Sequence, residues 1–124
     1  MGCILIIDDE EYIRDIIKAN LEIYGHSILE AADGLEGVEK ASRIPPDLII
    51  MDIGMPVLDG LQACQVLKAN RRTGVIPVLG FSGTADHRQI DRAMALGFDD
   101  FTAKPFREDE LISKVNALMG RSSA

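Results

Sequence analysis

Several residue types that mark secreted or nucleic-acid-binding chains are scarce in this sequence. Its two cysteines, Cys3 and Cys64, are too few for a disulfide framework, and both fall in apolar segments typical of reduced core positions. Lys and Arg number 13 against 20 Asp and Glu, so the formal net charge is −7. Because binding to a phosphate backbone relies on clustered basic residues, and no basic cluster occurs, we expect no direct nucleic-acid partner.

Long hydrophobic runs are also missing. The apolar start, Met1–Ile7, is too short to span a bilayer, and it lacks the basic start and the cleavage site of a signal peptide. We therefore expect a cytoplasmic chain without membrane contact. With 124 residues, 47% of them hydrophobic, and no linker, the chain should form one domain (1–124), with its core at about 3–119 and a short tail at 120–124.

Apolar segments alternate with amphipathic ones along the chain. Strands are expected at Cys3–Ile7, Ser27–Ala31, Leu48–Met51, Val78–Phe81 and Asp100–Ala103. A first helix should end at Gly25 and carry the residues that recur at helical spacing, Ile13, Ile16, Ile17, Asn20, Leu21 and Tyr24. Later helices are expected at about 35–42, 61–69, 86–96 and 108–119. The helix at 86–96 should point Ile90, Ala93 and Met94 inward and stop at Gly97. Three of the strands are apolar at consecutive positions, as in parallel strands covered on both faces. The pattern predicts an α/β fold with a doubly wound parallel sheet.

Polar residues end four of these strands. Asp8 and Asp9 follow the first strand, Asp52 the third, Ser82 the fourth and Lys104 the fifth. Ligands of open parallel sheets bind at the carboxyl ends of the strands, so these side chains should share one edge. Two carboxylates about 4 Å apart repel by about 4 kcal/mol at an effective dielectric of about 20, so either some are protonated or a cation joins them. Oxygen ligands suit Mg²⁺, and no His or Cys is near enough in sequence to favour zinc.

Most of these residues also have a structural explanation when taken alone. Asp9 would cap the following helix, Ser82 would stabilise a turn, and Lys104 would simply be solvated. Asp52 fits such an explanation less well, since it ends an apolar strand and no helix start follows it. Their joint placement favours a functional site.

The motifs at these strand ends resemble those of the receiver domain of two-component response regulators. They are Asp8-Asp9, Asp52-Ile53-Gly54-Met55-Pro56, Asp59-Gly60, Phe81-Ser82-Gly83, Gly97-Phe98-Asp99-Asp100-Phe101 and Lys104-Pro105-Phe106. The spacings match too, at 43 residues from Asp9 to Asp52, 30 from there to Ser82 and 22 more to Lys104. The resemblance covers nearly the whole chain, and all the motifs in this order are very specific.

The resemblance implies a flavodoxin-like (βα)5 three-layer sandwich with strand order 2-1-3-4-5. It implies that Asp52 accepts a phosphoryl group from a phosphohistidine on a sensor histidine kinase or a histidine phosphotransfer protein. The implied Mg²⁺ ligands are Asp8, Asp9, Asp52 and the backbone carbonyl of Gly54. Lys104 would pair with a phosphoryl oxygen, and the Lys104–Pro105 peptide would be cis.

The resemblance also implies a conformational switch. Ser82 and Phe101 stand at the two positions whose side chains move in the family, altering the face made by helix 4, strand 5 and helix 5. The expected output is contact with a downstream protein, with a homodimer as one option on phosphorylation. Such a domain is not an enzyme in the usual sense, although it assists its own phosphorylation and dephosphorylation.

Some positions depart from the family pattern. Ser82 stands where Thr is more frequent, Gly83 where Ala is usual, and Phe101 where Tyr is commoner. Gly54 and Thr84 occupy positions whose side chains influence phosphoryl hydrolysis in the family. Since Gly54 offers no bulk against water, we expect a short-lived phosphoryl group.

Three other functions compete with this interpretation. A flavin-binding electron carrier of the same fold needs a phosphate-cradling loop after the first strand, where this chain has Asp8-Asp9-Glu10-Glu11. A phosphohydrolase with an aspartate nucleophile typically carries a second acid two residues later, where this chain has Gly54. A degenerate receiver would only bind partners, but no member of the acid set is missing. A stand-alone regulator, a phosphorelay shuttle and a piece of a larger protein all fit the sequence.

Overall fold

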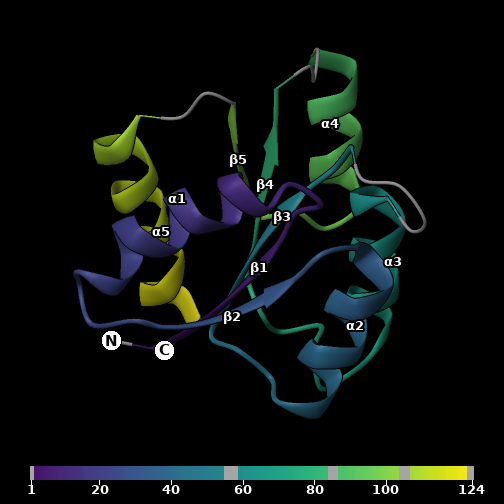
Figure 1. Ribbon diagram of the computed structural model, residues 1–124. Helices are drawn as coiled ribbons and strands as arrows, with labels where there is room; N and C mark the ends of the chain where they lie inside the picture. The colour runs from purple at the N-terminus through teal and green to yellow at the C-terminus, as the bar shows by residue number, and fades with distance from the viewer. Residues whose placement is uncertain (1, 55–58, 84–86, 104–106, 123–124) are drawn as a thin grey trace.

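A parallel sheet of five strands lies between two layers of helices (Figure 1). The computed structural model describes residues 2–54, 59–83, 87–103 and 107–122. The strands are β1 (Cys3–Ile7), β2 (Ser27–Ala31), β3 (Leu48–Asp52), β4 (Val78–Ser82) and β5 (Asp100–Ala103). They pair in the order β2-β1-β3-β4-β5, and every adjacent pair is parallel. The predicted α/β fold and the strand order 2-1-3-4-5 are confirmed.

Each strand is followed by a helix. The helices are α1 (Glu11–Glu22), α2 (Gly34–Arg43), α3 (Gly60–Ala69), α4 (His87–Ala95) and α5 (Glu108–Ser122). Helices α1 and α5 cover one face of the sheet, and α2, α3 and α4 cover the other (Figure 1). Within the described ranges, no helix combines the length and the apolarity that crossing a bilayer requires.

The central strands are buried on both faces, which explains their unbroken apolar sequences. Residues Ile4 to Ile7 of β1 are all fully buried. Successive side chains of a strand point to opposite faces, so Ile4 and Ile6 pack under α1 and α5, whereas Leu5 and Ile7 pack under α2, α3 and α4. An alternating pattern would have left one face of this sheet in water.

Met94, which the sequence pattern places inward, is exposed instead, and so are two residues of the expected first helix. Ile16 is 45% exposed, Tyr24 52% and Met94 42%. Tyr24 lies beyond the last residue of α1, and Ile16 lies on a second apolar stripe of that helix. Ala93 takes the buried position in α4, so the adjacent Met94 points away from it.

The predicted helix stops are confirmed at two glycines. Gly25 has φ 87° and Gly97 has φ 117°, a left-handed conformation that other residues rarely adopt. Of the two free cysteines, Cys64 is in the core as expected, and burial raises the pKa of its thiol to about 11. Cys3 is only partly buried.

Both outer strands have a lysine over their backbone. Lys40 of α2 donates to the carbonyl of Glu30 in β2 at 2.5 Å, and Lys114 of α5 donates to the carbonyl of Phe101 in β5. Lys40 also pairs with Glu36, one turn earlier in α2, at 3.0 Å. An edge strand with open backbone groups is a template for pairing with other chains, and a charged side chain over it hinders such pairing.

Candidate functional site

Buried polar side chains gather at the carboxyl end of the sheet. Ile7 of β1 pairs with Met51 of β3, so the next residues, Asp8 and Asp52, are neighbours on adjacent strands. Ser82 ends β4, the next strand along the sheet. Asp8 is 1% exposed, Asp52 7% and Ser82 5%. Three predicted site residues thus lie together where parallel sheets bind their ligands.

Asp8 belongs to a cluster of acids that follows β1. The carboxylate oxygens of Asp8, Asp9 and Glu10 lie within 4.8 Å of one another. Asp8 is buried, whereas Asp9 and Glu10 are exposed. The Asp8 backbone N–H donates to the Ala31 carbonyl at 3.1 Å, and its Oδ1 accepts the Glu10 N–H at 2.9 Å. The buried member of the cluster is therefore held by the main chain on both sides.

Glu10 was not among the predicted site residues. It stands in a run of four acids, Asp8 to Glu11, and such a run usually marks a solvated helix start. Glu10 also occupies the cap position of α1, where its side chain makes no cap hydrogen bond. The explanation of Asp9 as the helix cap is therefore wrong.

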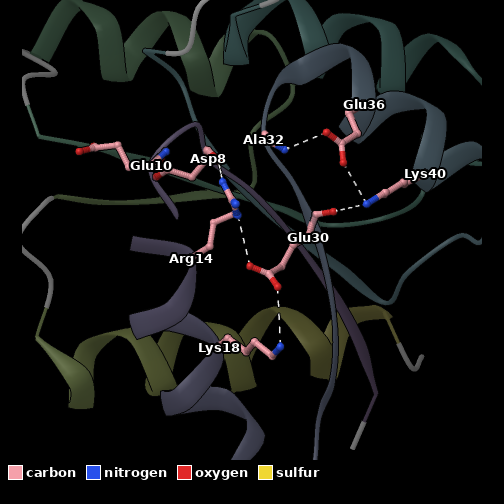
Figure 2. Close-up of polar contacts among 8 residues, drawn as sticks. All are labelled: Asp8, Glu10, Arg14, Lys18, Glu30, Ala32, Glu36 and Lys40. Carbon is pink, nitrogen blue, oxygen red and sulfur yellow. Dashed lines mark hydrogen bonds and ion pairs between the residues drawn. The ribbon is translucent and has the colours of Figure 1, made fainter. Parts of the chain in front are cut away.

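Arg14 connects the acid cluster to the edge strand β2 (Figure 2). Its Nη1 donates to the Asp8 backbone carbonyl at 2.7 Å, and its Nε donates to Oε1 of Glu30 at 3.2 Å. The Arg14 side chain is 15% exposed. Lys18, one turn further along α1, approaches the other Glu30 oxygen at 3.7 Å and is 39% exposed. Sequence reasoning missed Arg14 because its spacing does not distinguish it from other helix cations.

The backbone around Asp52 is closely packed. Oδ1 of Asp52 accepts the Gly54 N–H at 3.0 Å. Gly60, the first residue of α3, lies so close that a Cβ on it would be 2.5 Å from the Asp52 carbonyl oxygen. Gly54 itself is exposed, and among the described residues a Cβ there would meet only Asp52 Oδ1, at 3.7 Å. The short phosphoryl lifetime expected from Gly54 stays a prediction, which a large side chain at that position would test by lengthening the half-life.

The two proposed switch residues lie on neighbouring strands. Ser82 of β4 pairs with Ala103, and Phe101 of β5 pairs with Gly80. Phe101 is partly buried and packs against the core under α2, α3 and α4. A Cβ on Gly80 would lie 2.8 Å from the Phe101 ring and 2.8 Å from the Phe98 ring. Gly80 therefore provides the space that the inner edge of the Phe101 ring occupies.

Three predicted features lie outside the part of the chain that the structure describes. They are Lys104, the Lys104–Pro105 peptide and Thr84. The phosphoryl contact of Lys104 and the cis peptide stay predictions.

The described acids fit a hard divalent cation. Asp8 and Asp52 are two buried carboxylates on adjacent strands, which lie about 4.8 Å apart in a sheet, so a cation between them would relieve their repulsion. Asp9 and Glu10 add further oxygens beside Asp8. In the part of the chain that the structure describes, no His or Cys belongs to this cluster, and oxygen ligands suit Mg²⁺ rather than zinc.

Comparisons with known proteins agree with this geometry. A family model described as the response regulator receiver domain matches residues 4–116. The DNA-binding dual master transcriptional regulator RpaA of Synechocystis sp. is 38% identical over 122 residues, which cover 98% of this chain and 51% of that protein. The chain thus spans about half the length of the curated relatives it matches.

Solved structures of receiver domains superpose closely. The receiver domain of a signal transduction histidine kinase from Syntrophus aciditrophicus has a TM-score of 0.89 and 35% identity, covering 97% of this chain and 91% of that chain. The receiver domain of the sensor histidine kinase PA1611 from Pseudomonas aeruginosa has a TM-score of 0.89 and 29% identity, covering 96% and 98%. That protein holds a magnesium ion in its active site cleft. The present chain belongs to the response regulator receiver domain family.

Proposed function

We propose that this domain accepts a phosphoryl group on Asp52 in a Mg²⁺-dependent reaction and signals the change by protein contact. The burial of the Asp8 and Asp52 carboxylates on adjacent strands carries the proposal. Family membership supports a sensor histidine kinase or a histidine phosphotransfer protein as the donor. The proposed ligands of Mg²⁺ are Asp8, Asp9, Asp52 and the backbone carbonyl of Gly54.

The proposed reaction is a transfer between two covalent carriers. A carboxylate oxygen of Asp52 forms a bond to phosphorus, while the bond from phosphorus to the donor's imidazole nitrogen breaks and the imidazole keeps the electron pair. Bound Mg²⁺ supplies positive charge for the phosphoryl oxygens. The Gly54 N–H, 3.0 Å from Oδ1, orients the carboxylate. Lys104 is proposed to pair with a phosphoryl oxygen.

The proposed switch starts from a change of charge. A phosphoryl group brings the charge of the Asp52 side chain from one negative charge to about two. The Ser82 hydroxyl is proposed to turn toward the new oxygens, and the Phe101 ring then to turn inward. This movement would alter the surface made by α4, β5 and α5, where a downstream protein or a second copy of the domain would bind.

Helix α1 offers the donor protein an apolar surface near the acids. Tyr12 is 60% exposed, Ile16 45% and Ile23 76%. Because these positions are four and seven residues apart, they lie on one side of the helix. A row of exposed apolar side chains marks a protein contact site, and this row begins four residues after Asp8.

The output of a longer protein is a separate matter. RpaA is a DNA-binding regulator about twice the length of this chain, so nucleic-acid contact by a full protein is compatible with the family. For the domain itself we propose protein contact alone, because its net charge is −7. We further propose that it works in the cytoplasm as a switch that assists its own phosphorylation, without a separate substrate to turn over.

Incubation with acetyl phosphate and Mg²⁺, followed by intact mass measurement, tests the proposal. We expect the wild type to gain one phosphoryl group and Asp52→Asn to gain none. Asp59→Asn is the matched control, because it removes the same charge from a helix cap whose carboxylate accepts the Gln62 N–H, and Asn caps equally well. No gain in the wild type with Mg²⁺ or Mn²⁺, or an unchanged gain in Asp52→Asn, would disprove the proposal.

A further inference from the structure

We propose that Arg14 is a positioning residue for the Mg²⁺ site. Anchored on Glu30, it holds the end of β1 so that the carboxylates of Asp8 and Asp9 face the cation. The inference rests on the proposed metal site and adds to it two residues that do not touch the ion.

Arg14 contacts the main chain of Asp8. The contact is from Nη1 to the backbone carbonyl, at 2.7 Å (Figure 2). Asp8 makes two further hydrogen bonds. Its N–H donates to the Ala31 carbonyl at 3.1 Å, and its Oδ1 accepts the Glu10 N–H at 2.9 Å. Contacts on both its N–H and its carbonyl fix the peptide planes on either side of Asp8. They thereby set the direction in which three successive acids leave the sheet.

Glu30 anchors the Arg14 side chain to strand β2. Glu30 divides its carboxylate between two cations, with Oε1 on Arg14 at 3.2 Å and Oε2 near Lys18 at 3.7 Å. Its backbone lies in β2 and its carbonyl accepts from Lys40, so the residue sits on a rigid element. The planar guanidinium of Arg14 can donate to Glu30 and to the Asp8 carbonyl at once, which a lysine amine does less well.

A residue that orients metal ligands strengthens metal binding without touching the ion. Groups that orient metal ligands without touching the ion cost about 10–100-fold in affinity when they are removed. Charge alone makes the opposite prediction for Arg14. A positive charge beside the acids repels a cation, so by Coulomb's law its removal would tighten Mg²⁺ binding. The sign of the change therefore separates positioning from simple electrostatics.

Calorimetric titration of the unphosphorylated protein with Mg²⁺ measures this sign. We expect Arg14→Gln to weaken Mg²⁺ binding by about tenfold or more, and Arg14→Lys to fall between that variant and the wild type. Lys18→Gln is the matched control: it removes the same charge from the same helix and the same glutamate, but it lacks the Asp8 contact. Its affinity should stay within about twofold of the wild type.

Glu30→Gln, measured alone and combined with Arg14→Gln, gives a double-mutant cycle. Loss of the anchor should weaken Mg²⁺ binding, and combining it with Arg14→Gln should add little further loss, because both changes act through one contact chain. Additive losses would show that Glu30 and Arg14 act separately, against the proposal.

Thermal unfolding with and without Mg²⁺ separates positioning from a merely structural role. A structural role would lower Tm by the same amount in both conditions, whereas positioning reduces the rise in Tm that Mg²⁺ produces. Unchanged or tighter Mg²⁺ binding by Arg14→Gln, or an equal loss in Lys18→Gln, overturns the positioning role alone. A wild type that binds no Mg²⁺ overturns the proposed metal site and this inference together.

Discussion

Gly60 joins the first turn of α3 to the main chain that carries Asp52. A Cβ at this position would lie 2.4 Å from Ile53 Cα and 2.5 Å from the Asp52 carbonyl oxygen. Both are backbone atoms, which cannot turn aside as the end of a side chain can. The contact between the helix and the proposed phosphoacceptor therefore depends on the absence of a side chain at Gly60.

We expect Gly60→Ala to lower the free energy of unfolding by about 1–3 kcal/mol, the usual cost of forcing extra volume into a packed site. Urea unfolding measures the change. Gly120→Ala is the control, since Gly120 lies in α5 and a Cβ there meets no described atom within 4 Å. Alanine is the better helix former, so this variant should gain up to about 1 kcal/mol. A change of the same sign in both variants would contradict the argument.

Asp8, Asp52 and Ser82 could be placed together from the sequence, whereas Arg14 could not. The three residues directly follow or end apolar strands, and parallel strands bring their carboxyl ends to one edge. Arg14 acts through a hydrogen bond to a backbone carbonyl, and any helix cation could make such a bond. Which cation makes it depends on how α1 lies against β2, and no residue pattern states that.

We expect His26, in the short connection between α1 and β2, to make the stability of the fold depend on pH. Nδ1 of His26 accepts the Gly2 N–H at 3.2 Å, and burial lowers the pKa of this imidazole from its usual 6.5. The unfolded chain then binds the proton more readily than the folded one. The stabilising contribution is present above pH 6.5 and is lost as the pH falls through the folded-state pKa.

We expect His26→Gln to reduce the pH dependence of stability on the acid side of neutrality. Glutamine keeps an acceptor but does not titrate, so the variant should lose less stability than the wild type between about pH 7.5 and 5.5. Urea unfolding at the two pH values gives the comparison. Equal losses in the two proteins would show that His26 does not contribute.

Element positions followed from the sequence more reliably than helix faces did. Continuous apolar strands have one explanation in a small domain, which is burial on both sides. A helix with two apolar stripes has more than one possible orientation, and α1 exposes Ile16 on the stripe that the sheet does not cover. The spacing of apolar residues shows that a helix is amphipathic, but only the contacts of the folded chain show which stripe is buried.

For the whole molecule, we expect the lysines over the two outer strands to limit association with other chains. We expect Lys40→Met to lower the free energy of unfolding by about 1 kcal/mol, less than a buried charged hydrogen bond would cost because Lys40 is 35% exposed. The pKa of Glu36 is lowered mainly by its hydrogen bond from Lys40, so it should rise in the variant. Sedimentation velocity should also detect concentration-dependent association, since the β2 carbonyl loses its cover.

Lys18→Met is the control for this prediction. This substitution removes the same charge beside Glu30. Because Lys18 contacts the Glu30 side chain and not its carbonyl, Lys40 stays over the β2 backbone in this variant. Equal association of the two variants would show that net charge, and not the covered carbonyl, limits association.

The layered parallel sheet could be predicted from the residues, but its strand order needed the family resemblance. Right-handed crossovers allow several orders for five parallel strands, and local patterns do not choose among them. The order depends on which helix packs beside which, as in the contact of Gly37 in α2 with Ile7, where a Cβ would lie 2.3 Å from Ile7 Cδ1.

The covered edge of β2 has a consequence for the chain as it leaves the ribosome. Lys40 follows Glu30 by only ten residues, so the outer side of β2 is closed soon after it is made. β3, β4 and β5 lie one after another on the far side of β1, in the order in which they are made. If the strands pair in that order, the growing sheet has one edge without a lysine over it, the one that the next strand will occupy, until Lys114 is made and contacts β5. The pairing surface would then lie where the next segment of the same chain emerges.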